Sequence, residues 1–292
     1  MRSDIAHAQT SGEVGPSRHY AVAPVLGGVE LLSAVYRNHR FAPHSQETAV
    51  IGVVEQGRAV VFGAGETVTL ETGSVLVIPP HVMHDSFSLD DTDWHYRALY
   101  LNAAQLAALY PGAEVGHGVL GTRPFALRDS RVTDRVLATH AALRRCADRG
   151  EGCVRDDLQG LLVALDEAAS RRDTVTAGRE VSVGVARVRT LLDNDPLPKR
   201  SLGEMAQLAR LSRFTFAHAF SRAYGIAPHA YALQRRVKAV RDLLVAGELV
   251  SRAAHEVGFA DQSHLTRRFI STVGVTPGEF RRAWQQAQSV VP

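Results

Sequence analysis

Between residues 30 and 100 the hydrophobic positions fall in short β-branched runs of four to six residues, separated by glycines. The stretch AVIGVVEQGRAVVFGAGETVTLETGSVLVIPP shows this pattern, with turn glycines such as Gly57 and Gly73. Alternation of apolar and polar positions is imperfect around Val60, but the composition is that of strands. Many short strands broken by glycine turns predict a sandwich or small barrel.

After the strands the hydrophobic period becomes helical. Residues 130–150 place apolar side chains near one face, with Ser130 as a cap and Gly150 as a stop. Residues 153–172 form a second such pattern, with leucines on one side. Two amphipathic helices beside a small barrel, at about 130–172, predict a dimer seam. The alternative is that they pack on their own barrel.

From residue 185 onward the pattern is one of short helices, and an internal repeat orders them. LSRFTFAHAFSRAYGIAPHAY (211–231) matches ADQSHLTRRFISTVGVTPGEF (260–280) at a constant offset of 49 residues. Upstream of these segments the offset is 48, so the turn of the second copy contains one extra residue. The extra residue lies beside Gly258, which supplies the positive φ that such a turn often needs.

Each copy contains the same parts: a short helix, a tight turn, a capping residue and a second helix stopped by glycine. Ser212 and Asp261 are the predicted N-caps. The copies are two helix-turn-helix units, at about 201–224 and 250–273. A helix over 228–247, about 30 Å long, joins them, and could hold both units in successive major grooves about 34 Å apart.

Charge is distributed unevenly along the chain. Residues 185–292 hold 16 lysines and arginines against 8 acidic residues, a balance of +8, whereas residues 1–184 hold 17 against 22, a balance of −5. A basic C-terminal third predicts a polyanionic partner, and a merely solvated basic surface is the alternative. Together with the repeated helix-turn-helix pattern, the charge favours double-stranded DNA.

Other classes of protein find little support. No run approaches the roughly 18–20 apolar residues that span a bilayer, and residues 1–20, a predicted flexible tail, lack a signal-peptide core. We expect a cytoplasmic protein with no membrane partner. Cys146 and Cys153 form no metal-type pair and fit a reducing compartment. No catalytic residue, metal or cofactor is expected, since no catalytic triad, phosphate loop or zinc cluster is found.

The motifs RRVKAVRDLL, VGFADQS, LTRRF and GVTPGEFRR resemble those of the AraC/XylS family of bacterial transcription regulators. The resemblance covers the last third of the chain. It implies a DNA-binding module of two helix-turn-helix units, usually fused to an effector-binding or dimerisation domain. We therefore place the DNA-binding domain at residues 185–286, after a linker at 173–184.

Base-contacting candidates face away from the predicted helical core. In the second unit they are Gln262, Ser263, Thr266 and Arg267, and in the first Arg213, Phe214, Ala217 and His218. Glutamine can pair bidentately with adenine, and serine or threonine with several bases. Similar proteins often have a polar residue and an arginine at the positions of Ala217 and His218, so the first unit is expected to be the weaker reader. For Arg235, Arg236 and Arg241 we expect solvated salt bridges.

HRFAPHSQETAVIGVVEQG (39–57) and GSVLVIPPHVMHD (73–85) resemble the two motifs of the cupin barrel. His44 and His84 match metal-binding histidines of cupin enzymes, but Gln46 stands where a further histidine would be, and an amide is a poor ligand for a transition metal. The resemblance therefore favours a small organic effector inside the barrel. The candidate effector-binding residues are His44, His84, Trp94, Tyr96 and Arg97.

The sequence thus predicts an α+β protein of two domains. Residues 21–172 form a cupin-like β barrel with a helical pair, and residues 185–286 form an all-α double helix-turn-helix. We expect a sequence-specific transcription regulator that binds promoter DNA, responds to a small-molecule effector and forms a homodimer, with RNA polymerase as a further candidate partner. The alternatives are a metal-sensing regulator, a cupin-type metal-dependent enzyme fused to a DNA-binding module, or a regulator whose barrel binds no ligand.

Overall fold

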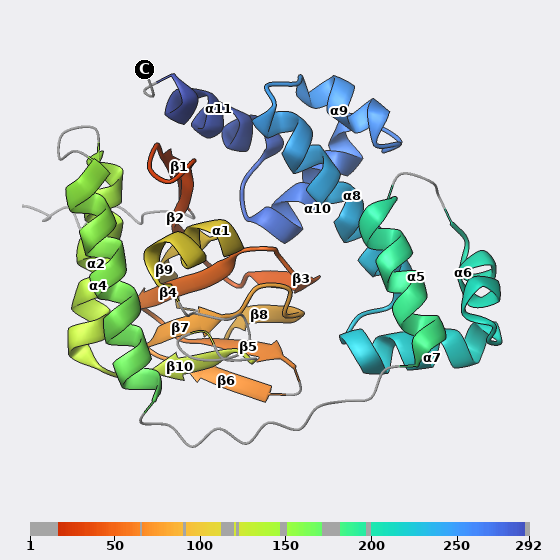
Figure 1. Cartoon of the computed structure of the whole chain (residues 1–292), viewed down its shortest axis with the longest axis horizontal. Coiled ribbons are helices and arrows are strands. Elements are labelled where there is room, and N and C mark those ends of the chain that lie inside the picture. Colours follow the sequence, from red (N-terminus) through yellow and green to blue (C-terminus); the bar gives the residue numbers. More distant parts are fainter. Residues whose placement is uncertain are drawn as a thin grey trace, which may run out of the picture.

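The computed structural model of the protein describes residues 17–64, 66–89, 92–111, 120, 123–146, 151–170, 182–196 and 200–289 (Figure 1). Most of the predicted tail and linker lies outside these described residues. Residues 18–20, assigned to the tail by sequence, instead begin strand β1 (Arg18–Ala23), so that prediction is wrong for them. Backbone pairing with the next strand holds them, and the Tyr20 ring stacks on Phe280 at 5.3 Å.

The strands form two antiparallel sheets. The larger sheet contains, in spatial order, β1, β2 (Val29–Tyr36), β9 (Trp94–Leu101), β4 (Ala49–Gln56), β7 (Val75–Ile78) and β10 (Phe125–Leu127). The smaller sheet contains β3 (Arg40–His44), β8 (His84–Ser88), β5 (Ala59–Gly63) and β6 (Glu66–Leu70). No ladder of hydrogen bonds joins the two sheets among the described strands, so the expected barrel is instead an open two-sheet sandwich.

The larger sheet is buried on both faces, and its strands carry apolar residues at successive positions. Leu31 and Ile51 point outward into a cluster with the helices that cover the sheet. Their neighbours Leu32 and Val50 point inward, toward the smaller sheet. A strand covered on both sides needs apolar residues at successive positions rather than at every second one. The covering helices are α1 (Ala103–Leu109), α2 (Ser130–Arg144) and α4 (Glu151–Ala169).

Helices α2 and α4 place their apolar faces on the sheet of their own domain (Figure 1). Leu158, Leu161, Leu162 and Leu165 are all fully buried there. This packing corresponds to the alternative that the two helices pack on their own domain. The outer faces of α2 and α4 are mostly polar. The N-cap of α2 is Asp129 rather than Ser130, because the Asp129 carboxylate accepts the first-turn amides.

The C-terminal part is entirely helical among its described residues. Its helices are α5 (Val183–Asn194), α6 (Leu202–Ala209), α7 (Arg213–Tyr224), α8 (Pro228–Val245), α9 (Val250–Glu256), α10 (Gln262–Val273) and α11 (Pro277–Gln288). Helices α5, α6 and α7 enclose a small core of their own around Phe216 and Phe220. The first turns of α8 close this core with Tyr231.

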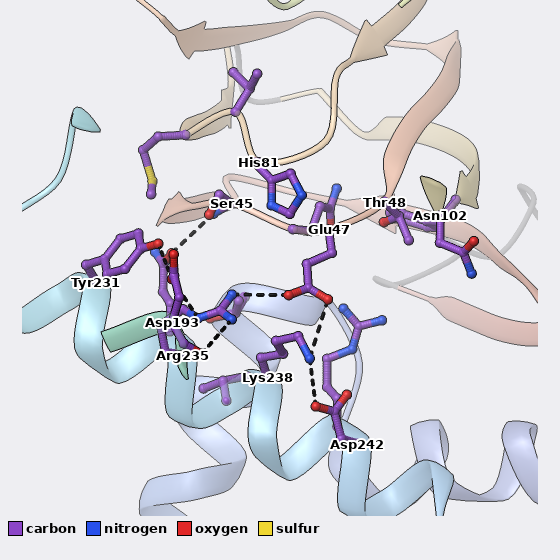
Figure 2. Close-up of a pocket in the computed structure, with 18 of the residues that line it drawn as sticks. Ser45, Glu47, Thr48, His81, Asn102, Asp193, Tyr231, Arg235, Lys238 and Asp242 are labelled. Atoms are coloured by element: carbon purple, nitrogen blue, oxygen red, sulfur yellow. Dashed lines mark hydrogen bonds and ion pairs between the residues drawn. The ribbon is translucent and has the colours of Figure 1, made fainter. Parts of the chain in front are cut away.

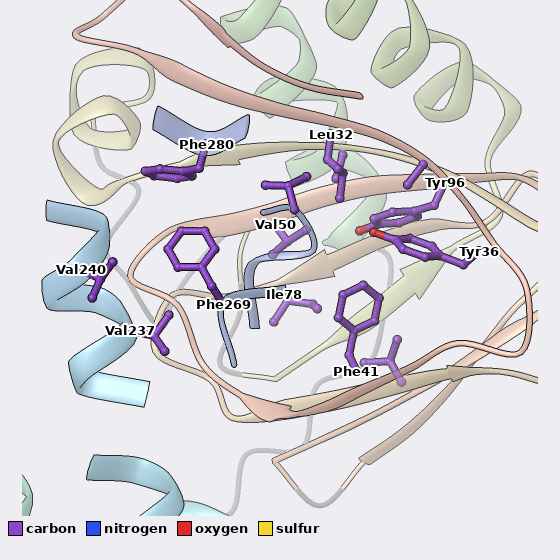
Figure 3. Packing of buried hydrophobic residues seen from close by; sticks show 14 of the residues in the cluster. Leu32, Tyr36, Phe41, Val50, Ile78, Tyr96, Val237, Val240, Phe269 and Phe280 are labelled. Carbon is purple, nitrogen blue, oxygen red and sulfur yellow. The ribbon is translucent and has the colours of Figure 1, made fainter. Parts of the chain in front are cut away.

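The second helical unit has no separate core. Phe269 of α10 and Phe280 of α11 belong to the same buried cluster as Tyr36 and Phe41 of the sandwich (Figure 3). The C-terminal half of α8 adds Val240 to this cluster. The contacts pair α10 with β3 and α11 with β1. The second unit is therefore packed directly onto the open end of the sandwich, and α8 links it to the first unit.

Candidate DNA-binding surface and interdomain cleft

The turn of each helix-turn-helix unit depends on one residue in the left-handed region. In the second unit this residue is Gly258, with φ of 77°, as the sequence predicts. In the first unit the equivalent residue, 48 positions earlier, is Arg210, with φ of 57°. A side chain in this region is unfavourable, by about 1–2 kcal/mol. The two turns thus have the same conformation but different residues to support it.

The caps of the second helices follow the sequence prediction. The Ser212 hydroxyl accepts the Thr215 amide at 3.1 Å, and the Asp261 carboxylate accepts the His264 amide at 2.6 Å. Each helix ends at a glycine with positive φ, Gly225 or Gly274. Caps of this kind satisfy backbone groups that the helix itself leaves unpaired. They fix where α7 and α10 begin, and hence which side chains their first turns present.

The core positions of both second helices are as predicted. Phe216, Phe220, Leu265 and Phe269 are fully buried. The faces opposite them carry the side chains that are candidates for DNA contact. On α10, Gln262, Ser263 and Arg267 are exposed, while Thr266 is half-buried and its hydroxyl donates to the Gln262 carbonyl at 2.8 Å. The structure brings these four together on the first two turns of one helix.

The first unit presents a different surface. Arg213, Phe214 and His218 are exposed on α7, and Phe214 is 83% exposed. The rings of Phe214 and His218 are nearly parallel, with centroids 6.4 Å apart. Ala217 is half-buried between them along the helix. An aromatic pair offers an apolar surface, suited to thymine methyl groups, rather than the hydrogen-bonding side chains of α10.

The candidate effector residues are only partly brought together. His44 and His84 are directly paired across β3 and β8, with ring centroids 4.3 Å apart, and both are buried. Each Nδ1 donates to a backbone carbonyl, from His44 to Ala42 at 2.8 Å and from His84 to Val82 at 2.9 Å. Burial lowers the pKa of both imidazoles, that of His84 to about 3, with the neighbouring His44 adding to the effect. Both rings are therefore neutral at physiological pH.

Trp94 and Tyr96 are also buried inside the sandwich, with ring centroids 5.3 Å apart. Arg97 is not near them, because successive residues of β9 point to opposite faces. Its guanidinium forms an ion pair with Glu55 at 2.6 Å instead. Within the described part of the chain, no group of three or more His, Cys, Asp or Glu side chains is arranged to hold a metal ion. Nor is any described helix both long and apolar enough to cross a bilayer.

A cleft of about 800 Å³ lies between the sandwich and the helices of the C-terminal part (Figure 2). One wall is the β3–β4 loop, residues 45–48, with Asn102 beside it. The opposite wall is the polar face of α8, and the end of α5 contributes Arg189 and Asp193. The lining also includes Tyr224 of α7, Thr272 of α10, and Phe280 and Trp284 of α11, so the cleft contacts the sandwich, the joining helix and both helical units at once.

Ion pairs cross this cleft from α8 to the sandwich. Arg241 donates to both carboxylate oxygens of Glu30, at 2.6 and 2.8 Å, and this pair is largely buried. Nearer the opening, Glu47 lies 3.3 Å from Arg235 and 3.4 Å from Lys238. Arg235 and Arg241 do form salt bridges, but neither is the solvated pair that was expected, because the two side chains are only 18% and 20% exposed.

Sequence reasoning missed the cleft and the acidic partners of its basic side chains. Glu30 and Arg241 are 211 positions apart, so no local pattern connects them. One signal was available: three basic residues, at 235, 238 and 241, lie at the three-residue spacing of one helix face. That face is not the one that packs into the helical core, and an acidic N-terminal part provides obvious partners for it.

The fold and these sites define a class of protein in which a β-sandwich sensor domain carries two helix-turn-helix units. Comparison with known proteins agrees with this class. The family model of the AraC-like ligand binding domain matches residues 26–153, and that of a helix-turn-helix domain matches residues 205–283. The chain therefore belongs to the AraC family of transcription regulators.

Individual relatives are distant. An AraC-like transcription regulator of Streptomyces lividans is 31% identical over 99 residues, or 34% of this chain and 33% of the relative. The match thus spans about a third of that relative's length. The regulator YbfI of Bacillus subtilis is 23% identical over 229 residues, covering 77% of this chain and 82% of YbfI.

Solved structures of the whole architecture are also similar. Apo ToxT from Vibrio cholerae, in a variant form, has a TM-score of 0.53 at 14% identity, with 87% of this chain and 97% of ToxT covered. Wild-type ToxT bound to an unsaturated fatty acid has a TM-score of 0.52 at 13% identity, with 93% and 97% covered. At this identity the likeness concerns the fold, and it extends over both domains.

Proposed function

We propose that this protein is a sequence-specific DNA-binding transcription regulator whose N-terminal domain responds to a small molecule. The observation that carries the proposal is the pair of helix-turn-helix units, each with a capped second helix whose outer face is exposed. We divide the chain into a sensor domain at residues 21–172 and a DNA-binding domain at residues 185–286, joined by residues 173–184. Such a protein would act in the cytoplasm and would not be an enzyme.

In this proposal α10 enters a major groove and reads bases. Gln262 would pair with adenine, Ser263 and Thr266 would contact further base edges, and Arg267 would bind the phosphate backbone. On α7, Arg213 would bind phosphate, while Phe214 and His218 would contact base edges or methyl groups. The phosphate contacts would make affinity fall steeply with salt.

The effector is proposed from the match of the sensor domain to AraC-like ligand binding domains. The fatty acid bound by ToxT is consistent with regulation by a small organic molecule in this architecture. Metal-dependent cupin chemistry is the second candidate function, favoured only by the buried pair of His44 and His84. Metal analysis of the purified protein tests it, since stoichiometric iron, manganese or zinc would support the enzyme.

A homodimer and a contact with RNA polymerase complete the proposal. The outer faces of α2 and α4 are the proposed dimer surface, because their inner faces already cover the larger sheet. This surface would have to be a polar one, with exposed residues such as Arg135 and Glu167. Analytical ultracentrifugation with and without DNA would measure the assembly state.

Mapping of bound genomic sites, followed by fluorescence anisotropy with the purified full chain, tests the central proposal. Gln262→Ala should reduce discrimination between the preferred site and a site with one altered base pair, by roughly 1–3 kcal/mol. Non-specific binding should be retained, since phosphate contacts remain. The matched control is Gln286→Ala, an exposed glutamine on α11. Equal loss of binding to all DNA would contradict a base-reading role for Gln262.

A further inference from the structure

The turn of the first helix-turn-helix unit contains an arginine where the second unit has glycine. Arg210 has φ of 57° and ψ of 41°, and Gly258, 48 positions later, has φ of 77°. In both turns the amide of the following residue donates to the carbonyl five positions before it. This left-handed conformation is unfavourable for any residue with a side chain, and glycine adopts it freely. Arg210 therefore carries a strain that the second unit avoids.

The Arg210 side chain has no polar contact that would offset this strain within the described part of the chain. The residue is exposed, and its guanidinium forms no ion pair or hydrogen bond with any described residue. The one acid between residues 201 and 224 is Glu204, whose carboxylate already accepts the Ser201 amide at 2.6 Å. The turn lies on the side of the first unit that is farther from the sandwich (Figure 1). A strained residue without such contacts in its own fold indicates a role outside it.

Arg210 lies directly before the helix that is proposed to enter DNA. Ser212, two residues later, is the N-cap of α7, and Arg213 and Phe214 are its first exposed side chains. A Cβ added to Gly203, near the start of α6, would lie 3.0 Å from the Arg213 guanidinium, so that arginine reaches from one helix start to the other. Recognition helices insert by their N-terminal residues, and the preceding helix crosses the DNA backbone. Phosphates therefore pass close to the α6–α7 turn in such a complex.

The two units also differ in the groups that they present to DNA. At the positions of Gln262 and Thr266 on α10, the first unit has Arg213 and Ala217, so α7 has fewer side chains that could pair with base edges. Residues 201–224 contain three arginines and one acid, a balance of +2, and residues 250–273 contain three arginines and two acids, a balance of +1. The first unit is thus better suited to phosphates than to bases.

We propose that Arg210 binds a phosphate of the DNA backbone beside the groove that α7 enters. The first unit then contributes mainly electrostatic affinity, and the second unit contributes most of the base discrimination. A phosphate contact carries no sequence information directly, so its contribution is the same for every DNA sequence. The contact in the complex offsets the strain that Arg210 has in the free protein. This inference rests on the proposed function, because it requires that α7 enters a groove.

Fluorescence anisotropy of the full chain at several salt concentrations tests the contact. The probes are the preferred duplex from genomic mapping and a random duplex of equal length. Arg210→Ala and Arg210→Gly should each make the slope of log affinity against log salt shallower by about 0.9 for every chain bound. The loss of affinity between about 50 and 200 mM salt should then be about 3.5-fold smaller than for the wild type. At low salt both variants should bind the two duplexes roughly threefold to tenfold more weakly.

Three substitutions at this position separate the charge of Arg210 from its strain. Arg210→Gly removes both, Arg210→Ala removes the charge and keeps the strain, and Arg210→Lys keeps both. Arg210→Lys should retain the wild-type slope, because lysine binds phosphate as a point charge. The matched control is Arg58→Ala, which removes an exposed arginine of the sensor domain and should leave the slope unchanged. Hydrogen exchange in α6 and α7 checks that the first unit stays folded, and Arg210→Gly keeps the test decisive should Arg210→Ala fail to fold.

The inference is overturned if Arg210→Ala and Arg210→Gly keep the wild-type slope, or if Arg210→Lys loses as much as they do. It is also overturned if Arg210→Gly binds as the wild type does while Arg210→Ala does not, since the effect would then come from the geometry of the turn. A wild-type chain that binds neither duplex contradicts the proposed function and this inference together. A chain that binds DNA with no contribution from Arg210 contradicts this inference alone.

Discussion

The two helix-turn-helix units have the same parts but different attachments. The first unit encloses its own core around Phe216 and Phe220, and Met83 of the sandwich packs against that core. The second shares one continuous core with the sandwich, through Phe269 and Phe280. A unit with its own core can change orientation and expose little apolar surface, here that around Met83. A unit that shares a core cannot, because each buried aromatic side chain contributes about 1.5–3 kcal/mol to the contact.

Because of this difference, the two recognition helices differ in how firmly they are held relative to the sensor domain. Helix α10 is fixed relative to the sensor domain, while α7 is positioned through α8 and the ion pairs of the cleft. Two units that occupy successive major grooves must have one defined relative orientation. The structure therefore suggests that adjustment for DNA occurs in the first unit, around Arg235, rather than in the second.

Removal of Phe280 should have the largest effect on this asymmetry. Its ring is fully buried and packs on Tyr20 at 5.3 Å and on Phe269 at 5.4 Å. Phe280→Ala should cost about 3–5 kcal/mol, and should accelerate amide hydrogen exchange in α10 and also in β1 and β2. Phe216→Ala is the matched control, with a similar cost confined to α5, α6 and α7. Unchanged exchange in the strands of Phe280→Ala would show that the cores are not coupled.

Breaking the buried ion pair between Glu30 and Arg241 should have the second-largest effect on stability. Arg241→Met leaves a buried carboxylate without its partner, which costs roughly 3–5 kcal/mol in protein interiors, and we expect the lower end because both groups retain some exposure. Urea unfolding should report the loss as a lower free energy of unfolding. Arg128→Met, which breaks an exposed pair with Glu71, should cost less than about 1 kcal/mol.

A double variant distinguishes the ion pair from simple packing. Glu30→Gln combined with Arg241→Met removes both charges, and should recover most of the lost stability because no unpaired charge remains. If the double variant were as unstable as Arg241→Met alone, the stacking of the Arg241 guanidinium over Phe280 at 5.1 Å would be the stabilising contact instead of the ion pair with Glu30.

The repeated unit was predictable from sequence because its signals are local. Caps, stop glycines and core positions such as Phe216 and Leu265 recur at a fixed offset, and each depends on neighbours within two turns. The docking of the second unit was not predictable in this way. It depends on Phe280 meeting Tyr20, 260 residues earlier, and no periodicity connects them.

The candidate sites differ in the same way, because some have local sequence signals and others depend on tertiary packing. The exposed residues of α7 and α10 could be chosen from helical periodicity alone. The effector site could not, because the alternation in β9 that separates Trp94 from Arg97 was hidden by a sheet buried on both faces. The cleft needs the sandwich and α8 side by side, and that arrangement is a property of tertiary packing.

The smallest expected effects concern the turns within the two helix-turn-helix units. Gly258→Ala places a side chain at a φ of 77° and should destabilise α9 and α10 by about 1–2 kcal/mol. Arg210→Gly should change the first unit by less than about 1 kcal/mol, since relief of strain and the added freedom of the unfolded chain oppose each other. Hydrogen exchange within each unit measures both. Gly278→Ala, in the helix α11, would bring its added Cβ into ordinary contact with Arg282 Nη1 at 3.6 Å and should stabilise slightly. Equal losses for Gly258→Ala and Arg210→Gly would mean that Arg210 supports its turn through side-chain contacts, and that the two turns differ in more than their residue type.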